Sequence, residues 1–460
     1  MVLTCVVLGL VSGLLLTRDP IRSLGLAVGA AVAVAAIRHP VLALTLFLAQ
    51  VPFSSPLLDG FFPAKLQGGR LFFLLLVVSV LHAAVFRRTQ GRRIVFFDVV
   101  LAGYLALTVG SLVRTLMPLR EAFDLYLATT LIPIGTVLCV RFIRFDADDI
   151  DRVLDLLAGC AMVVAACLLV ERALFFNFFN PADALAGWNA FAGQATYRVS
   201  GPFVNPNNAG AFLVMGMALL ARRRGEDSAT PWWVWAGLAV IAAALFFTIS
   251  RAAYLAAGLV GVIYAVHRGR GAAIAAATVL GLAMVLASPW ASNSETIQSG
   301  VMNPSSMIYR LSLLEAASQM LTAGPVELVL GHGFENFRFL GNDYAPWIFA
   351  PVTPERGSGM PVHNDFLALV IHMGLLGLGA FIVLLALATR SGLRLRRRAL
   401  KSGRILEADR AVALLAIGVV QVVFAVTHVP FATHQLATLF WFSAALLVYQ
   451  GPGLLARARN

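Results

Sequence analysis

The sequence predicts an all-α polytopic integral membrane protein, with about 12–14 transmembrane helices in a single membrane domain over residues 1–460. Hydrophobic residues make up 59% of the chain and charged residues only 13%, whereas a soluble protein carries about a quarter charged residues. Apolar segments also recur from one end of the chain to the other. A bilayer core roughly 30 Å thick is crossed by about 20 helical residues, which most of these segments approach.

The apolar segments set the expected helices. They lie at residues 2–16, 23–37, 41–53, 71–86, 94–113, 121–142, 152–172, 208–221, 231–249, 252–266, 271–289, 364–389, 409–428 and 431–449. The first three are short and are expected to be tilted, broken or partly re-entrant. We divide 231–249 from 252–266 near Ser250-Arg251, because one helix over both would be about 54 Å long, nearly twice the hydrocarbon thickness.

The charge pattern indicates a membrane protein rather than a nucleic-acid-binding protein. The net charge is +12, but the basic residues gather in short connections between apolar segments. By the positive-inside rule these connections are cytoplasmic, which places the connections 175–207 and 290–362 on the outer face. The second of these holds more acids than arginines, which agrees with that placement. The working surface is therefore expected outside.

The outer connection 290–362 is expected to contain an amphipathic helix. Asn303 suits the N-cap, Pro304 suits the first helical position, and Gly324-Pro325 ends the helix. An apolar stripe at helical spacing, bordered by Arg310, predicts that the helix lies at the membrane interface. The stripe consists of Met307, Leu311, Leu314 and Leu321.

His363 is the candidate general base. It precedes the apolar segment 364–389 and follows the long outer connection, so it stands at a boundary between water and lipid. Unpaired N–H groups and the dipole at a helix N-terminus favour a neutral imidazole, which can accept a proton from a hydroxyl. The alternative is a histidine that only caps the helix or anchors it among headgroups. His428 and His434, also near the outer surface, are its rivals.

Three arginines on the outer face are candidate ligands of an anionic substrate. Arg251 lies at the proposed outer turn, Arg310 on the amphipathic helix and Arg198 in the loop Tyr197-Arg198-Val199-Ser200-Gly201-Pro202. A guanidinium group binds phosphate oxygens through two parallel hydrogen bonds and stays charged. A headgroup contact or a salt bridge to a loop acid would explain each arginine alone. The positive-inside rule predicts that arginines gather on the cytoplasmic side, so three arginines on the outer face indicate a function.

Three polar motifs have simpler explanations. Asn205-Pro206-Asn207-Asn208 is expected to form a turn and helix cap, although its amides could bind sugar hydroxyls. The glycine-bounded stretch 331–337 is interpreted as loop geometry rather than a substrate contact. Asp146-Ala147-Asp148-Asp149 resembles the Asp-x-Asp motif of metal-dependent glycosyltransferases, but it is placed in the cytoplasm, where acids favour a helix N-terminus. No cofactor and no metal are therefore predicted.

With these residues, the chain resembles the O-antigen ligase/polymerase family of bacterial membrane glycosyltransferases. The resemblance runs from about Tyr197 to Leu378 and covers the stretches 198–208, 249–254, 331–337 and 363–377, together with Arg310. It implies a GT-C-like arrangement in the bacterial inner membrane, with periplasmic loops at 175–207 and 290–362. It also implies transfer of a glycan from an undecaprenyl-diphosphate carrier to an acceptor hydroxyl at the periplasmic face. The acceptor would be the lipid A–core or another carrier-linked glycan.

The resemblance also assigns roles to residues. His363 matches the histidine that activates the acceptor hydroxyl, and Arg251 and Arg310 match the arginines that hold the diphosphate, with Arg198 a weaker match. Possible contacts with the glycan or the acceptor are Asn205, Asn207, Asn364, Asp365 and Tyr309. One departure is His372-Met373 before Gly374, where an acidic residue often precedes that glycine. We expect a metal-independent, inverting displacement without a covalent intermediate.

Two other functions fit parts of the sequence. A transporter or flippase would have ionisable residues deep in several spans, whereas Asp98, Asp124 and Glu171 lie near the ends of their segments. A cytoplasmic-face glycosyltransferase would use the Asp146 motif with a metal and a nucleotide sugar. Within the leading class, ligation to lipid A–core, polymerisation and protein glycosylation are not separated by these residues.

Overall fold

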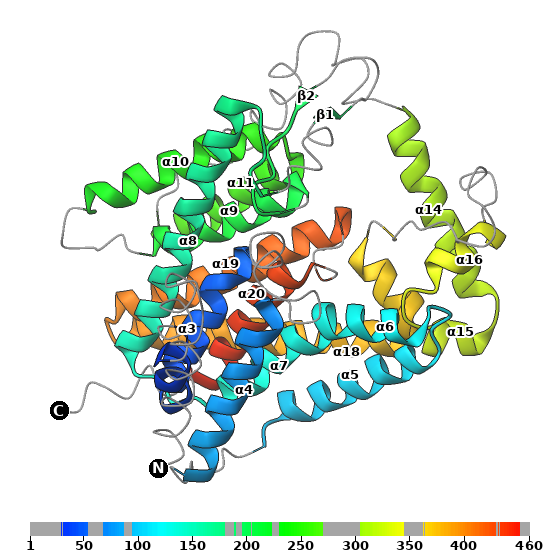
Figure 1. The fold of residues 1–460 in the computed structure, drawn as a ribbon, viewed down its shortest axis with the longest axis horizontal. Helices are drawn as coiled ribbons and strands as arrows, with labels where there is room; N and C mark the ends of the chain where they lie inside the picture. The colour runs from blue at the N-terminus through cyan, green and yellow to red at the C-terminus, as the bar shows by residue number, and fades with distance from the viewer. Residues whose placement is uncertain are drawn as a thin grey trace, which may run out of the picture.

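The structure is a computed structural model, and it describes residues 29, 31–53, 68–86, 94–179, 188–189, 196–203, 205–222, 230–269, 304–344, 362, 364–428, 431 and 433–450. The regular structure of these residues is almost entirely helical, as Figure 1 shows, and the exception is a pair of two-residue strands. The predicted all-α polytopic class is therefore confirmed. The predicted segments 2–16 and 271–289 lie outside the described residues.

Most of the described helices lie within the predicted apolar segments, whereas two short helices in the connection 290–362 were not predicted. The first group is α3 (Pro40–Gln50), η1 (Val51–Phe53), α4 (Gly68–Phe86), α5 (Phe96–Val113), α6 (Leu119–Tyr126), η2 (Leu127–Leu131), α7 (Ile132–Phe142) and α8 (Ala147–Leu174). The strands β1 (Trp188–Asn189) and β2 (Thr196–Tyr197) pair antiparallel. The remaining helices are α9 (Pro206–Ala221), α10 (Trp232–Thr248), α11 (Arg251–His267), α14 (Pro304–Thr322), α15 (Pro325–Leu330), α16 (Phe337–Tyr344), α18 (Asp365–Lys401), α19 (Ile405–Thr427), α20 (His434–Ala445) and η6 (Leu446–Gln450).

Six of the described helices are long and apolar enough to cross a membrane. They are Gly69–Phe86, Phe96–Val113, Leu119–Phe142, Ala147–Leu174, Asp365–Lys401 and Ile405–Val426. Four shorter apolar helices lie at Pro40–Phe53, Pro206–Ala221, Trp232–Thr248 and Arg251–His267. The chain is thus a multi-pass membrane protein, while the total of 12–14 spans remains a prediction.

The break between α10 and α11 lies where the length argument places it. α10 ends at Thr248, Ile249 adopts a left-handed conformation with φ of 50°, and Ser250 caps α11 by accepting a hydrogen bond from the Ala253 N–H at 3.4 Å. Both helices pack against α9. A β-branched residue at positive φ is strained, so this turn is held by its surroundings.

One helix is longer than predicted. The segment expected at 364–389 continues as α18 to Lys401, so the basic stretch 390–401, expected to be a connection, is helical. Ala388, Gly392, Leu395 and Ala399 are buried at helical spacing on this extension. The arginines between them occupy the other faces, so an apolar stripe extends the helix beyond the point where hydropathy falls.

The amphipathic helix of the outer connection has the predicted bounds, and in its described part Leu321 of the predicted stripe packs against the buried cluster whereas Leu314 does not. α14 starts at Pro304 and ends at Thr322, and its buried residues are Leu313, Ala316, Ala317 and Met320, which pack against Phe337, Val362 and Ile371. Leu314, a member of the predicted stripe, is 50% exposed. Small alanines let α14 approach α16 and α18 closely, and a stripe chosen from the largest apolar residues missed this.

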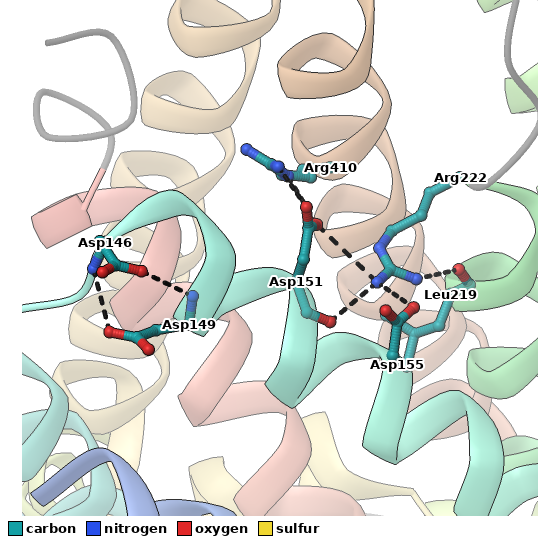
Figure 2. Close-up of polar contacts among 7 residues, drawn as sticks. All are labelled: Asp146, Asp149, Asp151, Asp155, Leu219, Arg222 and Arg410. Atoms are coloured by element: carbon teal, nitrogen blue, oxygen red, sulfur yellow. Dashed lines mark hydrogen bonds and ion pairs between the residues drawn. The ribbon is translucent and has the colours of Figure 1, made fainter. Parts of the chain in front are cut away.

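The acidic motif before α8 is a helix cap, as expected. Asp146 accepts a hydrogen bond from the Asp149 N–H at 2.8 Å, and Asp149 accepts one from the Asp146 N–H at 3.3 Å (Figure 2). This reciprocal pair satisfies the free N–H groups of the first turn of α8.

A buried ionic cluster joins α8, α9 and α19 near the same end. Arg222, with no exposed surface, donates to Asp155 at 2.6 Å and to the Leu219 carbonyl at 2.8 Å, and Arg410 donates to Asp151 at 2.8 Å (Figure 2). The neighbouring Asp409 accepts from Arg268 at 2.7 Å and lies 2.8 Å from the His267 ring, which brings in α11. These side chains join α8, α9, α11 and α19. Hydrophobic burial alone would fix the relative positions of these helices only weakly.

Arg222→Met tests this cluster. The substitution keeps the length of the side chain and leaves Asp155 and Asp151 short of a partner, so we expect a loss of about 3 kcal/mol of stability. The matched control is Arg152→Met, because Arg152 pairs with Asp149 while 75% exposed; its effect should stay below about 1 kcal/mol. Thermal unfolding of the purified protein in detergent measures both, and equal losses would contradict a special role for the cluster.

Candidate active site

Four helices begin close together at one end of the bundle. The Asn208 side chain near the start of α9 donates to Thr433, the residue before α20, at 3.0 Å. Asp365, the first residue of α18, accepts from the Phe431 N–H at 2.8 Å. Gly210 of α9 lies against Ala253, in the first turn of α11. Helix N-termini carry partial positive charge and free N–H groups, so their meeting forms a surface that favours anions.

Arg198 closes the turn between α10 and α11. Its guanidinium donates to the Thr248 carbonyl at 3.0 Å, to the Ile249 carbonyl at 3.3 Å and to the Asn207 side chain at 3.2 Å. Burial lowers the pKa of Arg198 to about 10, and the charge of Arg251 acts in the same direction. The group therefore stays cationic at neutral pH. It offsets the negative end of α10 while adding positive charge beside α9 and α11.

The loop that carries Arg198 is held by a buried carboxylate. Glu171, near the end of α8, accepts hydrogen bonds from the Tyr197 hydroxyl at 3.1 Å, the Ser200 N–H at 3.2 Å and the Gly201 N–H at 2.6 Å. Burial and this carboxylate raise the pKa of Tyr197, so the phenol remains a hydrogen-bond donor. The Val199 N–H also bonds to the Phe247 carbonyl at 3.3 Å, which fixes the loop on α10.

Arg251 is an exposed cation in this region. It is the first residue of α11, directly after the Ser250 cap, and its side chain is exposed. The Tyr254 hydroxyl donates to the Phe246 carbonyl at 2.7 Å, which ties the first turn of α11 to the last turn of α10. Arg198 and Arg251 are therefore brought together, one buried and one exposed, at a helix N-terminus.

The asparagine and aspartate residues predicted to contact the substrate form hydrogen bonds within the protein. Asn205 caps α9 by accepting from the Asn207 N–H at 2.8 Å, and Asn207 accepts from Arg198. Asn364 caps α18 by accepting from the Leu367 N–H at 3.0 Å, and donates to the Val426 carbonyl at 2.9 Å. Asp365 is 4% exposed. The expected turn and cap role of the 205–208 stretch is therefore observed, and sugar contact by these residues stays a prediction.

Three predicted site residues cannot be placed in the same detail. His363 lies outside the described residues, and Tyr309 and Arg310 are described only as part of α14. Val362 and Asp365, which lie on either side of His363 in the sequence, are described, and both line one pocket.

The glycine-bounded stretch 331–337 closes a break in α18. Gly374 has φ of 66° inside that helix, and the kink frees carbonyl groups from their intrahelical partners. The His332 N–H bonds to the Ile371 carbonyl at 2.6 Å and the Gly333 N–H to the His372 carbonyl at 3.2 Å. The loop therefore supplies the missing donors, as the loop interpretation predicts.

The turn between α5 and α6 holds the other side of the same loop. Arg114 donates to the Gly331 carbonyl at 2.8 Å, and the Phe334 N–H bonds to the Ser111 carbonyl at 2.9 Å. The Asn336 side chain donates to the Arg114 carbonyl at 2.8 Å and accepts from the Leu116 N–H at 2.6 Å. Figure 1 shows this loop region, between α15 and α16, beside α5 and α6. The loop is thus rigidly placed between two parts of the bundle.

A pocket with an empty volume of about 850 Å³ lies between this loop and α5, α6, α18 and α20. Its polar lining residues are Thr108, Ser111, Thr129, Thr130, Glu335, Arg338, Asp365 and His372. Sequence reasoning missed Glu335, Arg338 and the polar face of α5 as site residues. Glu335 lies in the stretch 331–337, interpreted from the sequence as loop, and Arg338 follows it in α16. Nothing in the sequence indicates that α5 faces these two residues.

Within the described residues, no group of three or more His, Cys, Asp or Glu side chains is arranged to hold a metal ion. The groups that this region offers to a ligand include cationic side chains, helix N-termini, hydroxyls, aromatic rings and the Glu335 carboxylate. Such a set suits a substrate that combines an anionic part with a polar, hydroxylated part.

Comparison with known proteins agrees with this chemistry. Residues 236–382 match the family described as O-antigen ligase, and the matched part runs from α10 into α18. It includes Arg251, Arg310, His363 and the 331–337 loop, while Arg198 and the α9 cap precede it. The match supports membership of the chain in the O-antigen ligase/polymerase family, as the motifs predict. No curated protein matches the chain.

Gly374→Ala tests the docking of the loop in the break of α18. A Cβ there would overlap the Val329 carbonyl oxygen, at a φ that alanine rarely adopts. Left-handed strain and overpacking together predict a loss of about 2–4 kcal/mol. Gly379→Ala, further along α18, is the control, since no atom lies within 4 Å of the position that its added methyl group would occupy. Denaturation in detergent should show loss only for the first variant; equal stability of both would disprove the docking.

Proposed function

We propose that this protein is a glycosyltransferase that moves a glycan from an undecaprenyl-diphosphate carrier to an acceptor hydroxyl at the periplasmic face of the bacterial inner membrane. The family match supports a role in glycan ligation or polymerisation. The observation that carries the finer proposal is the meeting of helix N-termini and arginines beside the motif that contains His363. We infer that the anionic leaving group, the diphosphate, and the neutral base, His363, meet in this region.

The diphosphate occupies the cationic side of this region. Arg251 is exposed at the N-terminus of α11, so its guanidinium and the N–H groups of that turn can bind phosphate oxygens together. Arg310 is the second arginine that the sequence resemblance assigns to the diphosphate, and we propose that it contributes to the same site. Arg198 is committed to carbonyl groups and Asn207, so it acts through its charge and by fixing the turn. This placement stabilises the negative charge that the diphosphate gains as it leaves.

The acceptor hydroxyl reacts beside His363. Its oxygen forms a bond to the anomeric carbon while the bond from that carbon to the diphosphate oxygen breaks. The hydroxyl proton passes to the His363 imidazole, and the electron pair of the broken bond leaves with the diphosphate. Attack opposite the leaving group inverts the anomeric configuration. The protein mainly positions reactants and neutralises charge, since the diphosphate is already a good leaving group.

The acceptor is the lipid A–core for a ligase or another carrier-linked glycan for a polymerase, and both present a sugar hydroxyl. The two activities share the donor chemistry described above. Purified protein supplied with the carrier-linked glycan and each acceptor in turn distinguishes them, because only the true acceptor gains mass.

His363→Ala tests the base. Removal of a general base lowers kcat by about 10²–10⁴-fold, whereas folding should be unaffected because His363 precedes the capped helix. Transfer from carrier-linked glycan to acceptor, measured with the purified variant, reports kcat. His39→Ala, at an exposed position before α3 that makes no capping hydrogen bond, is the control and should transfer normally. Normal turnover by a folded His363→Ala variant would refute the assignment.

Arg251→Met tests the diphosphate site. Loss of one charge-assisted hydrogen bond should lower kcat/KM for the carrier-linked donor by about 10–150-fold, and the acceptor KM should not change. Arg251→Lys should recover part of the loss, because the charge remains without the paired donors. Arg152→Met, which removes an exposed arginine at the opposite end of α8 from Glu171, serves as control. An unchanged donor kcat/KM in Arg251→Met would place the diphosphate elsewhere.

A further inference from the structure

The pocket beside α18 has a lining that suits a sugar. Its aromatic residues come from α5, α6, the 331–337 stretch, the connection before α20 and α20 itself, and they are Tyr104, Tyr126, Phe334, Phe337, Phe431 and Trp441. Aromatic faces pack against the C–H faces of a sugar ring, and hydroxyls and charged groups bind its rim.

A charged pair is built into the wall of this pocket. Arg338 donates to Glu335 at 2.6 Å, and their side chains are 32% and 10% exposed. Glu335 has φ of 57°, a conformation that few residues other than glycine adopt, and the surrounding loop is fixed by Asn336 and Arg114. A carboxylate and a guanidinium held side by side in a fixed loop can accept from and donate to neighbouring sugar hydroxyls.

One wall of the pocket carries hydroxyl groups. Thr108 and the Tyr126 hydroxyl lie 2.8 Å apart, and one turn further along α5 the Ser111 side chain is 1% exposed. The Ser111 hydroxyl forms no hydrogen bond with any described residue. A buried hydroxyl without a partner is costly unless a ligand or water satisfies it. An apolar lipid tail in this pocket would satisfy neither Ser111 nor the charged pair.

The pocket adjoins the proposed reaction centre. Val362 and Asp365, on both sides of His363 in the sequence, belong to its lining, and Asp365 accepts from Phe431 of the same lining. A sugar bound here is therefore connected through one short stretch of chain to the candidate base. We propose that this pocket is a saccharide subsite, which holds one sugar unit of a reacting glycan through Glu335, Arg338 and Ser111.

The subsite rests on the proposed function, and its sugar can come from either of two sources. The donor glycan and the acceptor glycan share the same ring and hydroxyl chemistry. The two sources differ in kinetics, because loss of a subsite contact raises the KM of the substrate that occupies it.

Arg338→Met and Ser111→Ala test the subsite in the full-length purified protein. Each should raise the KM of the donor or of the acceptor, by about tenfold for the charged contact and about fivefold for the hydroxyl. The controls are matched in kind. Arg152→Met removes an exposed arginine from another pair with the same three-residue spacing, and Thr438→Ala removes another buried hydroxyl that has no partner among the described residues, outside the pocket lining.

The outcomes separate the possibilities. A raised KM for one substrate, with controls unchanged, supports the subsite and identifies its occupant. Unchanged KM values for both substrates in folded variants overturn it. If Arg338→Met does not fold, Ser111→Ala decides, since the described part of the protein loses no hydrogen bond there and a purely structural role predicts no change.

Failure of the proposed function is recognised separately. If the wild-type protein transfers no glycan, binding of the glycan released from its carrier is measured by calorimetry. Binding that weakens in Ser111→Ala and Arg338→Met, but not in the controls, still supports a sugar site. Absence of binding to the wild type overturns the subsite as well.

Discussion

The first turns of α9, α11, α18 and α20 meet because short polar contacts join them, and the proposed chemistry depends on that meeting. The contacts are Asn208 with Thr433, Asp365 with the Phe431 backbone, and the close approach of Gly210 to α11. In a bilayer, apolar contacts alone do not fix the relative depth of two helices, because the lipid tails are as apolar as the helix surfaces. Directed hydrogen bonds at the helix ends fix that relative depth and hold the starts of these helices together.

The opposite ends of α9 and α11 are held by ion pairs to α8 and α19. Arg222 and Arg410 connect α9 and α19 to α8, and Asp409 connects α19 to α11. Because the same helices are fixed at both ends, displacement of one helix start would strain contacts at the far end. The break of α18 at Gly374 adds a third fixed point, where the 331–337 loop joins that helix to α5 and α6. A rigid frame of this kind suits a reaction in which the protein mainly positions the reactants and stabilises developing charge.

Hydropathy, helix caps and charge predicted most of the helices. The division at Ser250, the Asp146 cap and the limits of α14 followed from local chemistry: helix length, capping oxygens, and proline and glycine at the helix ends. The extension of α18 to Lys401 was missed because an amphipathic stripe, rather than mean hydropathy, continues that helix. In the described part of α14, Ala316 and Ala317 were missed as buried residues because the predicted stripe was chosen from larger apolar residues, and Leu314 of that stripe is exposed.

The pocket could not be predicted for a different reason. Its lining joins α5 and α6 to residues more than two hundred positions further along the chain, and no local pattern records such a contact. Gly331, Gly333 and Gly374 do carry a local signal, since each has positive φ, but a sequence alone does not show which glycines face one another. Arg198 illustrates the same limit. Its sequence context resembles a phosphate ligand, and only the fold shows that carbonyl groups occupy it.

The central claim is that a polyprenyl diphosphate binds where these helices begin. The most direct measurement is an electron cryo-microscopy map of the protein in lipid nanodiscs with the carrier-linked glycan bound. We expect diphosphate density against the first turn of α11, within hydrogen-bond distance of Arg251. Diphosphate density instead at the arginine-rich end of α18, near Arg396 and Arg398, would contradict it.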